Sequence, residues 1–390
     1  MPHYRIPPIP GNSRQIQTDP LPALPTPCLL LDPVKMDRNL ARLRERMKAL
    51  GVSLRPHLKT CKCWEIAARM LPAPQGPATV STLREAEFFA DHGVRDLTYA
   101  VGIAPNKLDR VQALHARGVD IAVILDSLEQ AQAVAARSRT AGRAIPALIE
   151  IDADGHRAGI NASDRERLLA LAAAIANGGE LRGVLTHAGA SYHAHGVAEL
   201  ERAAEGERAA AVEAAATLRA AGHACPVVSV GSTPTAHFAR NLEGVTEVRA
   251  GVYVFFDLVM ARLGVCGLDD IAISVLASVI GHQRGKGWIL TDAGWTAMSR
   301  DPGSGNHDFG VVCDLEGAPY PDLVVREMSQ EHGVVALRQR SKLALPELAV
   351  GTQVRILPNH ACATAAQFER YHVLAPEGTI ASEWPRFQGW

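Results

Sequence analysis

The sequence of 390 residues lacks the features that mark several common classes of protein. Its seven cysteines are an odd number and widely scattered, so they do not form a disulfide framework. No uncharged apolar run is long enough to span a bilayer, and the start, Met1–Arg5, lacks the apolar stretch of a signal peptide. A net charge of -1 gives no global field that would attract nucleic acid or an anionic membrane. We therefore expect a cytoplasmic globular protein with reduced thiols and no nucleic-acid or membrane partner.

What the sequence does contain is enough apolar material for a large core. The hydrophobic fraction is 47%, and the charged fraction of 21% is ordinary for a globular protein. With about 150 residues per domain as a prior, the chain holds one large or two medium domains. Residues 1–25 are rich in proline and polar groups and are expected to form an arm or covering segment.

From Thr26 onward, short apolar runs alternate with helical patterns, which is typical of parallel strands joined by crossover helices. Eight or nine such units over about 230 residues match the size of a (β/α)8 barrel. No Gly-x-Gly-x-x-Gly follows the first strand, which weighs against a dinucleotide-binding fold. The expected strands are Cys28–Leu31, Val52–His57, Thr79–Thr82, Leu97–Val101, Ile121–Leu125, Ala147–Ile151, Gly183–His187, Val227–Val230 and Glu247–Ala250.

After Asp257 the pattern changes to strands with few helices between them, which predicts a second, β-rich domain. The fold class is therefore α/β, with a (β/α)8 barrel over residues 26–258. Residues 1–25 and 259–390 are expected to form the β-rich domain. Its expected strands are Ile271–Ile280, Gly287–Asp292, Gln353–Leu357 and Tyr371–Leu374.

Lys59 stands just past a predicted barrel strand, in the run Arg55–Thr60 (RPHLKT). Active sites of such barrels are built at the C-terminal ends of the strands. A lysine that forms a Schiff base needs a free amine, and nearby cations or burial lower the pKa as required. Arg55, His57 and Lys62 are close enough in sequence to contribute. The alternative is a solvated surface lysine, since most lysines are exposed.

Gly231, Ser232 and Thr233 leave another predicted strand and lead into a helix with Pro234 near its first turn. Open N–H groups at such a helix start, together with two hydroxyls, would form a cradle for phosphate. Late loops of a barrel are the usual phosphate site. The run Arg249–Tyr253 follows one strand later and would complete the cradle. The alternative interpretation is a simple helix cap.

His360 and Cys362 form a His-x-Cys pair, expected on an extended segment that directs both side chains to one face. Imidazole and thiolate are both good zinc ligands, and two protein ligands leave positions open for water or substrate. The alternative is a chance pair with a small buried cysteine. The rival pair Cys61 and Cys63 is expected in a helix after Lys59, where a two-residue spacing separates the thiols. We interpret that pair as structural.

These segments fall in a fixed order along the chain and resemble a known family. The motifs are Arg55-Pro56-His57-x-Lys59-Thr60, Asp154-Gly155-His156-Arg157-x-Gly159, His187-Ala188-Gly189, Gly231-Ser232-Thr233-Pro234-Thr235 and Pro358-Asn359-His360-x-Cys362. The chain looks like a member of the D-threonine aldolase and D-serine dehydratase family of pyridoxal-phosphate enzymes, which have the alanine-racemase-like fold. The resemblance extends over nearly everything from Thr26 to Trp390.

The resemblance implies that pyridoxal 5'-phosphate is linked to Lys59, with Arg157 facing its phenolic oxygen and Tyr192 near its ring. It places the phosphate around two segments, and it implies a homodimer, a common symmetric assembly. The implied phosphate-binding residues are Gly231, Ser232, Thr233, Gly251 and Tyr253.

The resemblance also implies a divalent metal at His360 and Cys362, beside the substrate's β-hydroxyl. The thiolate favours zinc, with manganese, cobalt and magnesium as further candidates. Aldolases of the family usually carry His-Cys-Asp at the metal and ligate it with the carboxylate. This chain has His-Ala-Cys, as the dehydratases do.

We therefore expect a dehydratase (an ammonia-lyase) that converts a D-3-hydroxy amino acid to a 2-oxo acid and ammonia. The substrate would be 3-hydroxy-D-aspartate, D-serine or D-threonine, and the catalytic set is Lys59, His360 and Cys362. Lys59 would remove the α-proton, and the metal would act on the β-hydroxyl as a Lewis acid. The residues leave open an aldolase that yields glycine and an aldehyde, with His193 as base. A metal-free racemase and a non-catalytic cofactor-binding barrel are minor alternatives.

Overall fold

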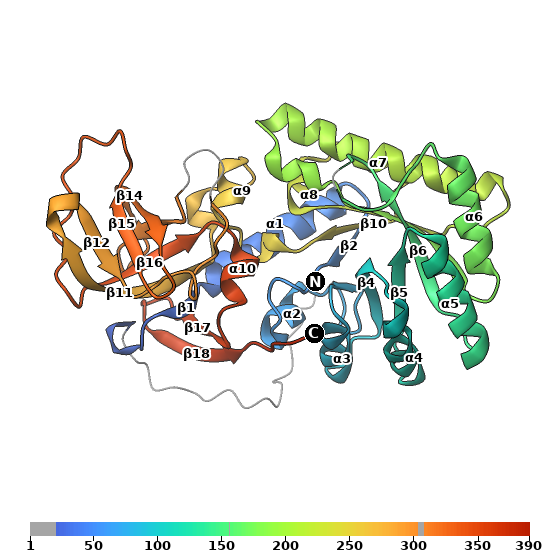
Figure 1. Cartoon of the computed structure of the whole chain (residues 1–390), viewed down its shortest axis with the longest axis horizontal. Helices are drawn as coiled ribbons and strands as arrows, with labels where there is room; N and C mark the ends of the chain where they lie inside the picture. The colour runs from blue at the N-terminus through green and yellow to red at the C-terminus, as the bar shows by residue number, and fades with distance from the viewer. Residues whose placement is uncertain (1–20, 156, 303–307) are drawn as a thin grey trace, which may run out of the picture.

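The computed structural model of the chain describes residues 21–155, 157–302 and 308–390. The proline-rich arm predicted at the start of the chain therefore lies, up to residue 20, outside the described residues. Figure 1 shows two lobes, one a parallel sheet surrounded by helices and the other built almost entirely of strands. Among the described residues, no helix combines the length and the apolar character needed to cross a membrane.

The first lobe is a barrel of parallel strands, as the sequence predicted. Its sheet runs in the order β2-β10-β9-β8-β6-β5-β4-β3, and the short β7 pairs with β6 off this path. A bridge between His57 and Thr79 closes the ring, with the Leu58 N–H donating to the Thr79 carbonyl at 2.9 Å. The strands are β2 (Ser53–Pro56), β3 (Ala78–Val80), β4 (Asp96–Gly102), β5 (Asp120–Leu125), β6 (Pro146–Asp152), β7 (Ile160–Asn161), β8 (Glu180–Thr186), β9 (Val227–Val230) and β10 (Glu247–Ala250).

Helices cover the outside of the barrel, and local sequence determines where several of them begin. Asp32 caps α1 by accepting hydrogen bonds from the N–H groups of Val34 and Lys35. Ser127 and Gln130 form a capping box at the start of α5. The α-helices are α1 (Pro33–Ala49), α2 (Trp64–Met70), α3 (Leu83–Asp91), α4 (Leu108–Ala116), α5 (Leu128–Ala141), α6 (Arg165–Ala176), α7 (Val197–Ala220), α8 (Thr233–Phe238), α9 (Leu258–Arg262) and α10 (Ala361–Ala365). The 3-10 turns are η1 (Leu21–Ala23), η2 (Pro105–Lys107), η3 (Gly189–His193), η4 (Val252–Val254), η5 (Leu268–Asp270) and η6 (Arg284–Lys286).

The second lobe is one mostly antiparallel sheet in the order β12-β15-β14-β13-β16-β11-β1-β17-β18. A further pairing of β12 with β11 closes part of this sheet into a small barrel. The predicted β-rich domain is therefore confirmed as architecture, while the division of the chain at residues 258 and 259 stays a prediction. The strands are β1 (Cys28–Leu31), β11 (Ile273–Gln283), β12 (Trp288–Thr291), β13 (Gly310–Cys313), β14 (Pro319–Met328), β15 (Gly333–Leu337), β16 (Gln353–Pro358), β17 (Arg370–Leu374) and β18 (Ile380–Pro385).

Strand β1 corrects one part of the prediction. We expected Cys28–Leu31 in the parallel barrel, but it pairs antiparallel with β11 and parallel with β17 in the second lobe. All four of its residues are buried. A short run that is apolar throughout indicates a strand covered on both faces, and it does not tell which sheet covers it.

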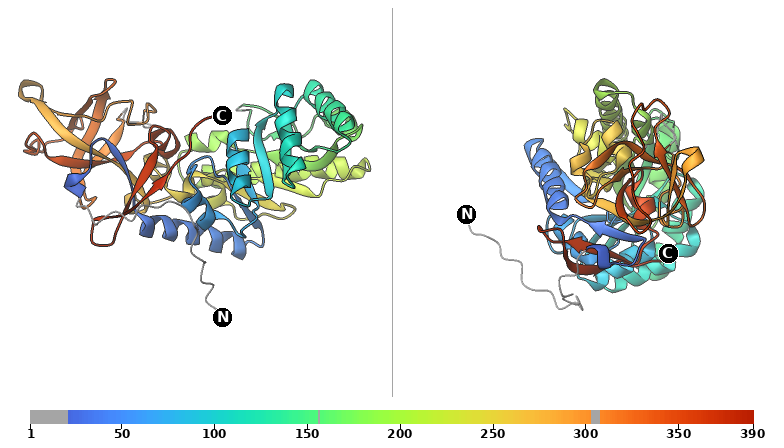
Figure 2. Two further views of the ribbon diagram at one scale, coloured as in Figure 1. Left: turned by 90° about the horizontal axis from the view of Figure 1, so that it is seen from below. Right: turned by 90° about the vertical axis from the view of Figure 1, so that its left-hand side faces the viewer.

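The end of the chain returns from the second lobe to the barrel, and the C-terminus lies between the lobes (Figure 2). The Phe387 N–H donates to the Lys62 carbonyl at 3.0 Å, and the Phe387 ring stacks on Phe88 with centroids 4.0 Å apart. The last residues therefore join the second lobe to the turn that contains Lys59.

Candidate active site

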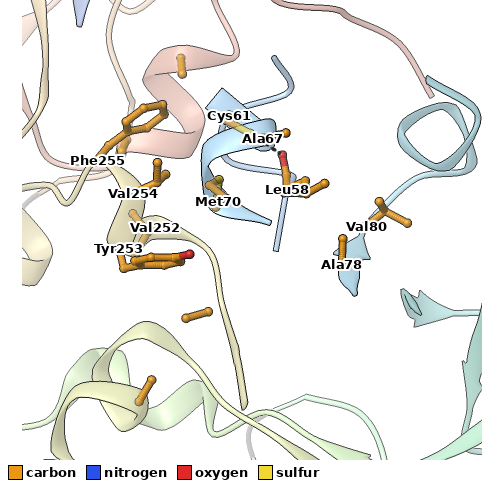
Figure 3. Close-up of a cluster of buried hydrophobic side chains, with 14 of the residues drawn as sticks. Leu58, Cys61, Ala67, Met70, Ala78, Val80, Val252, Tyr253, Val254 and Phe255 are labelled. Carbon is orange, nitrogen blue, oxygen red and sulfur yellow. Dashed lines mark hydrogen bonds between the residues drawn. The ribbon is translucent and has the colours of Figure 1, made fainter. Parts of the chain in front are cut away.

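Lys59 lies in the turn that follows β2, at the end of the barrel where the parallel strands finish. Its side chain is exposed, whereas Leu58 and Thr60 are fully buried. Figure 3 shows Leu58 and Cys61 of this turn among side chains from α2 and β3. Because both flanks of the turn are anchored in the core, the backbone of Lys59 is held at one point of the barrel mouth.

Cys61 and Cys63 also belong to this turn, so the helix predicted directly after Lys59 was wrong. Helix α2 begins only at Trp64, because Lys62 has a left-handed backbone conformation with φ 42° that a helix does not accommodate. Both thiols are fully buried. Burial raises the pKa of Cys61 to about 12 and that of Cys63 well above its ordinary value. Protonated and inaccessible, the two cysteines act as packing residues.

Two imidazole rings lie close enough to Lys59 for its charge to affect them. Burial lowers the pKa of His57 well below its ordinary value, and the charges of Lys59 and Arg249 add to this. Burial also lowers the pKa of His187 to about 4, although its ring nitrogen is 3.1 Å from the Gly231 carbonyl oxygen. Both rings are therefore neutral at neutral pH and place no additional positive charge beside the lysine.

The predicted phosphate cradle contains a helix cap and, among the described residues, one buried hydroxyl without a hydrogen-bond partner. Ser232 caps α8 in a capping box with Thr235. Among the described residues, the buried Thr233 hydroxyl has no hydrogen-bond partner. Gly231 has φ 131°, and a Cβ there would lie 2.3 Å from the Arg249 carbonyl oxygen. Only glycine fits at this position, so the chain can pass close to β10 before the helix begins.

In the second segment of the predicted cradle, the side chains of Arg249 and Tyr253 are buried away from the barrel mouth. The Arg249 guanidinium lies inside the barrel, where it donates to the Ser229 hydroxyl and the Thr186 carbonyl, both at 2.6 Å. The Tyr253 ring is buried in the hydrophobic core (Figure 3). This leaves Gly251 and the backbone N–H groups that begin η4, which have no acceptor within such a turn. A Cβ at Gly251 would lie 3.1 Å from the Thr60 hydroxyl, so the segment lies directly against the Lys59 turn.

Arg157 and Tyr192 both lie near the same mouth. Arg157 is exposed, and its charge adds to burial in lowering the pKa of His187 at the end of β8. Burial raises the pKa of Glu150 inside the barrel, and the Arg157 charge offsets part of this. Tyr192 is half-buried on η3, with its ring centroid 6.2 Å from that of His187. Burial raises the pKa of Tyr192, and the nearby Cys362 adds to this. Of the Asp154–Gly159 motif, residue 156 lies outside the described residues.

His360 and Cys362 do not stand on an extended segment, so that expectation was wrong. Strand β16 ends at Pro358, His360 is the N-cap of α10, and Cys362 lies in its first turn. The Asp257 carboxylate accepts the Ala361 N–H at 2.9 Å and the Met260 N–H at 3.0 Å, so it fixes the starts of both α9 and α10. The two side chains nevertheless meet, because they hydrogen-bond to one another.

The two side chains shift each other's pKa in opposite directions. Burial lowers the pKa of His360, but its hydrogen bonds with Cys362 and Asp301 outweigh this and raise the pKa to about 10. Burial raises the pKa of Cys362, but the hydrogen bond from His360 and the charges of His360 and Lys59 bring it below its ordinary value. Asp301 contacts the Nδ1 atom of His360, which orients the ring.

One contact joins the two predicted sites. The Thr60 hydroxyl lies 3.2 Å from the Cys362 sulfur, and Thr60 follows Lys59 directly in the chain. In residues 21–155, 157–302 and 308–390, no three His, Cys, Asp or Glu side chains are grouped so as to hold a metal ion. A metal at His360 and Cys362 would therefore have two ligands from these residues.

Sequence reasoning missed the residues that hold the site together. Asp257, Asp301 and Thr60 act through contacts with segments far away in the sequence. Glu207 on α7 is only 2% exposed and accepts the Ala188 N–H at 2.8 Å. A capping pattern at Asp257 was the one local signal, and it indicates a helix start without indicating what else the carboxylate holds.

A parallel barrel with a strand-end lysine, facing a β-rich lobe across a His-Cys pair, defines a two-domain enzyme of the alanine-racemase-like fold. Two family profiles match the chain: "Alanine racemase, N-terminal domain" over residues 31–259 and "Putative serine dehydratase domain" over residues 272–374. D-threo-3-hydroxyaspartate dehydratase of Delftia sp. (strain HT23) is 52% identical over 379 residues, which are 95% of this chain and 100% of that protein. D-serine dehydratase of Dictyostelium discoideum is 31% identical over 394 residues, 95% of this chain and 99% of that protein.

Solved structures agree with these relatives. The structure of the Delftia sp. HT23 dehydratase superimposes with a TM-score of 0.91 and 50% identity, covering 95% of this chain and 100% of that chain. The structure of D-threonine aldolase from Filomicrobium marinum gives a TM-score of 0.80 and 28% identity, covering 95% and 97%. The chain belongs to the family of D-threo-3-hydroxyaspartate dehydratase, D-serine dehydratase and D-threonine aldolase. This confirms the resemblance that its motifs indicated.

Proposed function

We propose that this protein is a dehydratase that uses pyridoxal phosphate and a divalent metal to convert a D-3-hydroxy amino acid to a 2-oxo acid and ammonia. The observation that supports it best is the 3.2 Å contact between the Thr60 hydroxyl and the Cys362 sulfur. This contact places Cys362, whose thiol can bind a metal, against the residue that follows Lys59 in the chain. A base for the α-proton and a Lewis acid for the β-hydroxyl would then act on adjacent carbons of one substrate.

The residues at the barrel mouth fit pyridoxal phosphate. Lys59 offers an exposed amine, and the unpartnered Thr233 hydroxyl and the N–H groups that begin η4 suit a phosphate. In this assignment, Gly231, Ser232, Thr233, Gly251 and the backbone of Tyr253 surround the phosphate. Arg157 and Tyr192 are assigned to the ring. When bound, the cofactor supplies an electron sink for the charge left at the substrate's α-carbon.

His360 and Cys362 fit a divalent metal, because a thiolate and an imidazole form a good ligand pair. Two solved variants of D-threo-3-hydroxyaspartate dehydratase replace a histidine and a cysteine that stand two positions apart, as this pair does, and the cysteine variant is described as in the metal-free form. We propose zinc first, since thiolate ligands favour it, before manganese, cobalt or magnesium. When bound, the metal supplies Lewis acidity that makes the β-hydroxyl a better leaving group.

The protein's own residues would bind the substrate and move its protons. Lys59 takes the α-proton, and His57 and His187 do not compete with it as bases, because burial lowers their pKa values. Thr60 and Gly251 hold the lysine turn against the metal pair. The reaction requires that the Lys59 amine and the His360–Cys362 pair face the same bound substrate.

The aldolase reaction is the second candidate, because the family includes D-threonine aldolase. It would require a base that removes the proton of the β-hydroxyl, and His193 on η3 is the candidate for it. Cys362 favours dehydration, since the aldolases usually have a carboxylate ligand in this motif. The substrate we propose first is 3-hydroxy-D-aspartate, before D-serine and D-threonine. We also propose that the protein is cytoplasmic and forms a homodimer.

The test is a product assay with D-serine, D-threonine and both D-configured 3-hydroxyaspartates, before and after treatment with EDTA. A 2-oxo acid and ammonia in equal amounts, formed only when metal is present, would support the dehydratase. Glycine with an aldehyde would instead identify an aldolase. Loss of both products in Lys59→Ala, with the metal content unchanged, would assign the lysine.

A further inference from the structure

Glu207 is a buried carboxylate on the outside of the barrel, where α7 runs next to α8 (Figure 1). Glutamate is among the residues that are almost never fully buried unless they are paired. The Glu207 carboxylate accepts the Ala188 N–H at 2.8 Å. It also hydrogen-bonds with the Thr235 hydroxyl and the Gly231 N–H. Three donors from two separate loops therefore converge on this one side chain.

The two loops joined by Glu207 both belong to the barrel mouth. Ala188 begins the segment after β8 that carries Tyr192 on η3. Gly231 and Thr235 border the segment after β9 that contains the unpartnered Thr233 hydroxyl. Each loop follows a different strand, so nothing local in the chain sets the distance between them.

A second contact runs between the same loops. The Ser191 hydroxyl lies 3.1 Å from the Ser232 hydroxyl, and Ser191 also donates to the Ala188 carbonyl at 2.7 Å. Weak hydroxyl contacts alone leave room for relative movement, whereas a buried carboxylate with several donors forms stronger, charge-assisted bonds.

Burial raises the pKa of Glu207 above its ordinary value. The Ala188 N–H, the Thr235 hydroxyl and the buried guanidinium of Arg249 act in the opposite direction and offset part of this shift. Arg249 in turn donates to Ser229 and Thr186 in the barrel interior. Glu207 thus connects the outer helix with both loops, and its interaction with Arg249 extends to the barrel interior.

We propose that Glu207 is a positioning residue for the cofactor phosphate, which holds the β8 and β9 loops together so that the Thr233 hydroxyl and the neighbouring N–H groups form one cradle. This rests on the proposed function, because it assumes that the cradle binds pyridoxal phosphate. The effect of Glu207 should then depend on the phosphate group of the ligand and not on its ring.

The experiment titrates apoprotein with pyridoxal phosphate and, separately, with pyridoxal, which lacks the phosphate. It compares wild type with Glu207→Ala, Glu207→Gln and the control Glu213→Ala, an exposed glutamate on the same helix. We expect about 10-fold to 100-fold weaker binding of pyridoxal phosphate in Glu207→Ala, because buried donors lose their acceptor. Pyridoxal binding should change far less, so the preference for the phosphorylated ligand shrinks. Glu207→Gln keeps one acceptor oxygen and should lie between.

The outcomes separate the two proposals. If wild type binds pyridoxal phosphate no better than pyridoxal, the proposed function itself fails. If wild type prefers the phosphate and the Glu207 variants keep that preference unchanged, Glu207 is only a packing residue. Thermal unfolding of each apoprotein identifies a variant that does not fold, and Glu207→Gln then decides the question alone.

Discussion

Replacing Thr60 by valine removes the one hydroxyl that links the Lys59 turn to Cys362, at almost constant side-chain volume. Thr60 is fully buried, so water does not replace the lost hydrogen bond to the sulfur. A hydrogen bond to a charged acceptor contributes about 1.5–3 kcal/mol, and we take the lower end because sulfur is a weak acceptor. The same hydrogen bond lowers the pKa of the Cys362 thiol, so without it a proton competes better with the metal, which corresponds to about 10-fold weaker apparent metal binding at neutral pH.

The assay is competition for zinc with a chelator of known affinity, followed by the spectrum of the cobalt-substituted protein. Without the hydrogen bond the thiolate donates more strongly, so its charge-transfer band should move to longer wavelength in Thr60→Val. Thr60→Ser should restore the wild-type band. Thr79→Val is the matched control, because Thr79 is equally buried and its hydroxyl has no partner among the described residues. Equal metal affinity in Thr60→Val and wild type, or an equal loss in Thr79→Val, would refute the role given to Thr60.

Four further variants test other parts of the protein. His360→Ala and Cys362→Ala should each lose metal and dehydratase activity while keeping the absorbance of bound pyridoxal phosphate; loss of the cofactor instead would contradict separate sites. Gly231→Ala should destabilise the apoprotein by about 2 kcal/mol or more in urea denaturation, because its Cβ would meet the Arg249 carbonyl at a left-handed φ. Burial lowers the pKa of His237 to about 4. Between about pH 6.5 and 4, His237 therefore binds more protons in the unfolded chain than in the folded protein. The stability from this group is lost as the pH falls. Glu150, Glu207 and Asp257 have raised pKa values and act in the opposite direction, so the comparison is with wild type. Between about pH 7 and 5, the free energy of unfolding of His237→Gln should fall by about 2 kcal/mol less than that of wild type. Parallel curves of unfolding free energy against pH for the two proteins would argue against this.

The barrel could be predicted because its strands are short apolar runs separated by regular helical patterns. That signal fails where tertiary contacts decide. Strand β1 has the same apolar character as a barrel strand, yet its partners β11 and β17 lie hundreds of residues away in the sequence. Strands β13, β14 and β15 were not predicted, and β14 begins with Pro319 and Pro321, residues that argue against a strand.

The candidate site divides in the same way. Lys59, the Gly231–Thr233 segment and the His360–Cys362 pair stand in compact motifs that the sequence displays. The residues that hold these motifs in place have no such motif in the sequence. Glu207 sits within an ordinary helical pattern, and only the packing of α7 against two loops brings three donors to its carboxylate.

The position of Cys362 on a helix rather than a strand has a similar cause. The Asp257 carboxylate accepts the N–H of Ala361, 104 residues later in the chain, and so fixes the start of the helix between His360 and Cys362. Local alternation therefore predicted that these two side chains meet, but by an incorrect geometry.

The most direct test of the central claim is the product balance from D-threo-3-hydroxyaspartate with the metal-loaded holoenzyme. Loss of the β-hydroxyl gives oxaloacetate and ammonia in equal amounts, whereas cleavage between the α- and β-carbons gives glycine and glyoxylate. We predict oxaloacetate and ammonia, abolished by EDTA and restored by zinc. Glycine and glyoxylate, or an oxaloacetate yield that EDTA leaves unchanged, would contradict a metal-assisted dehydratase.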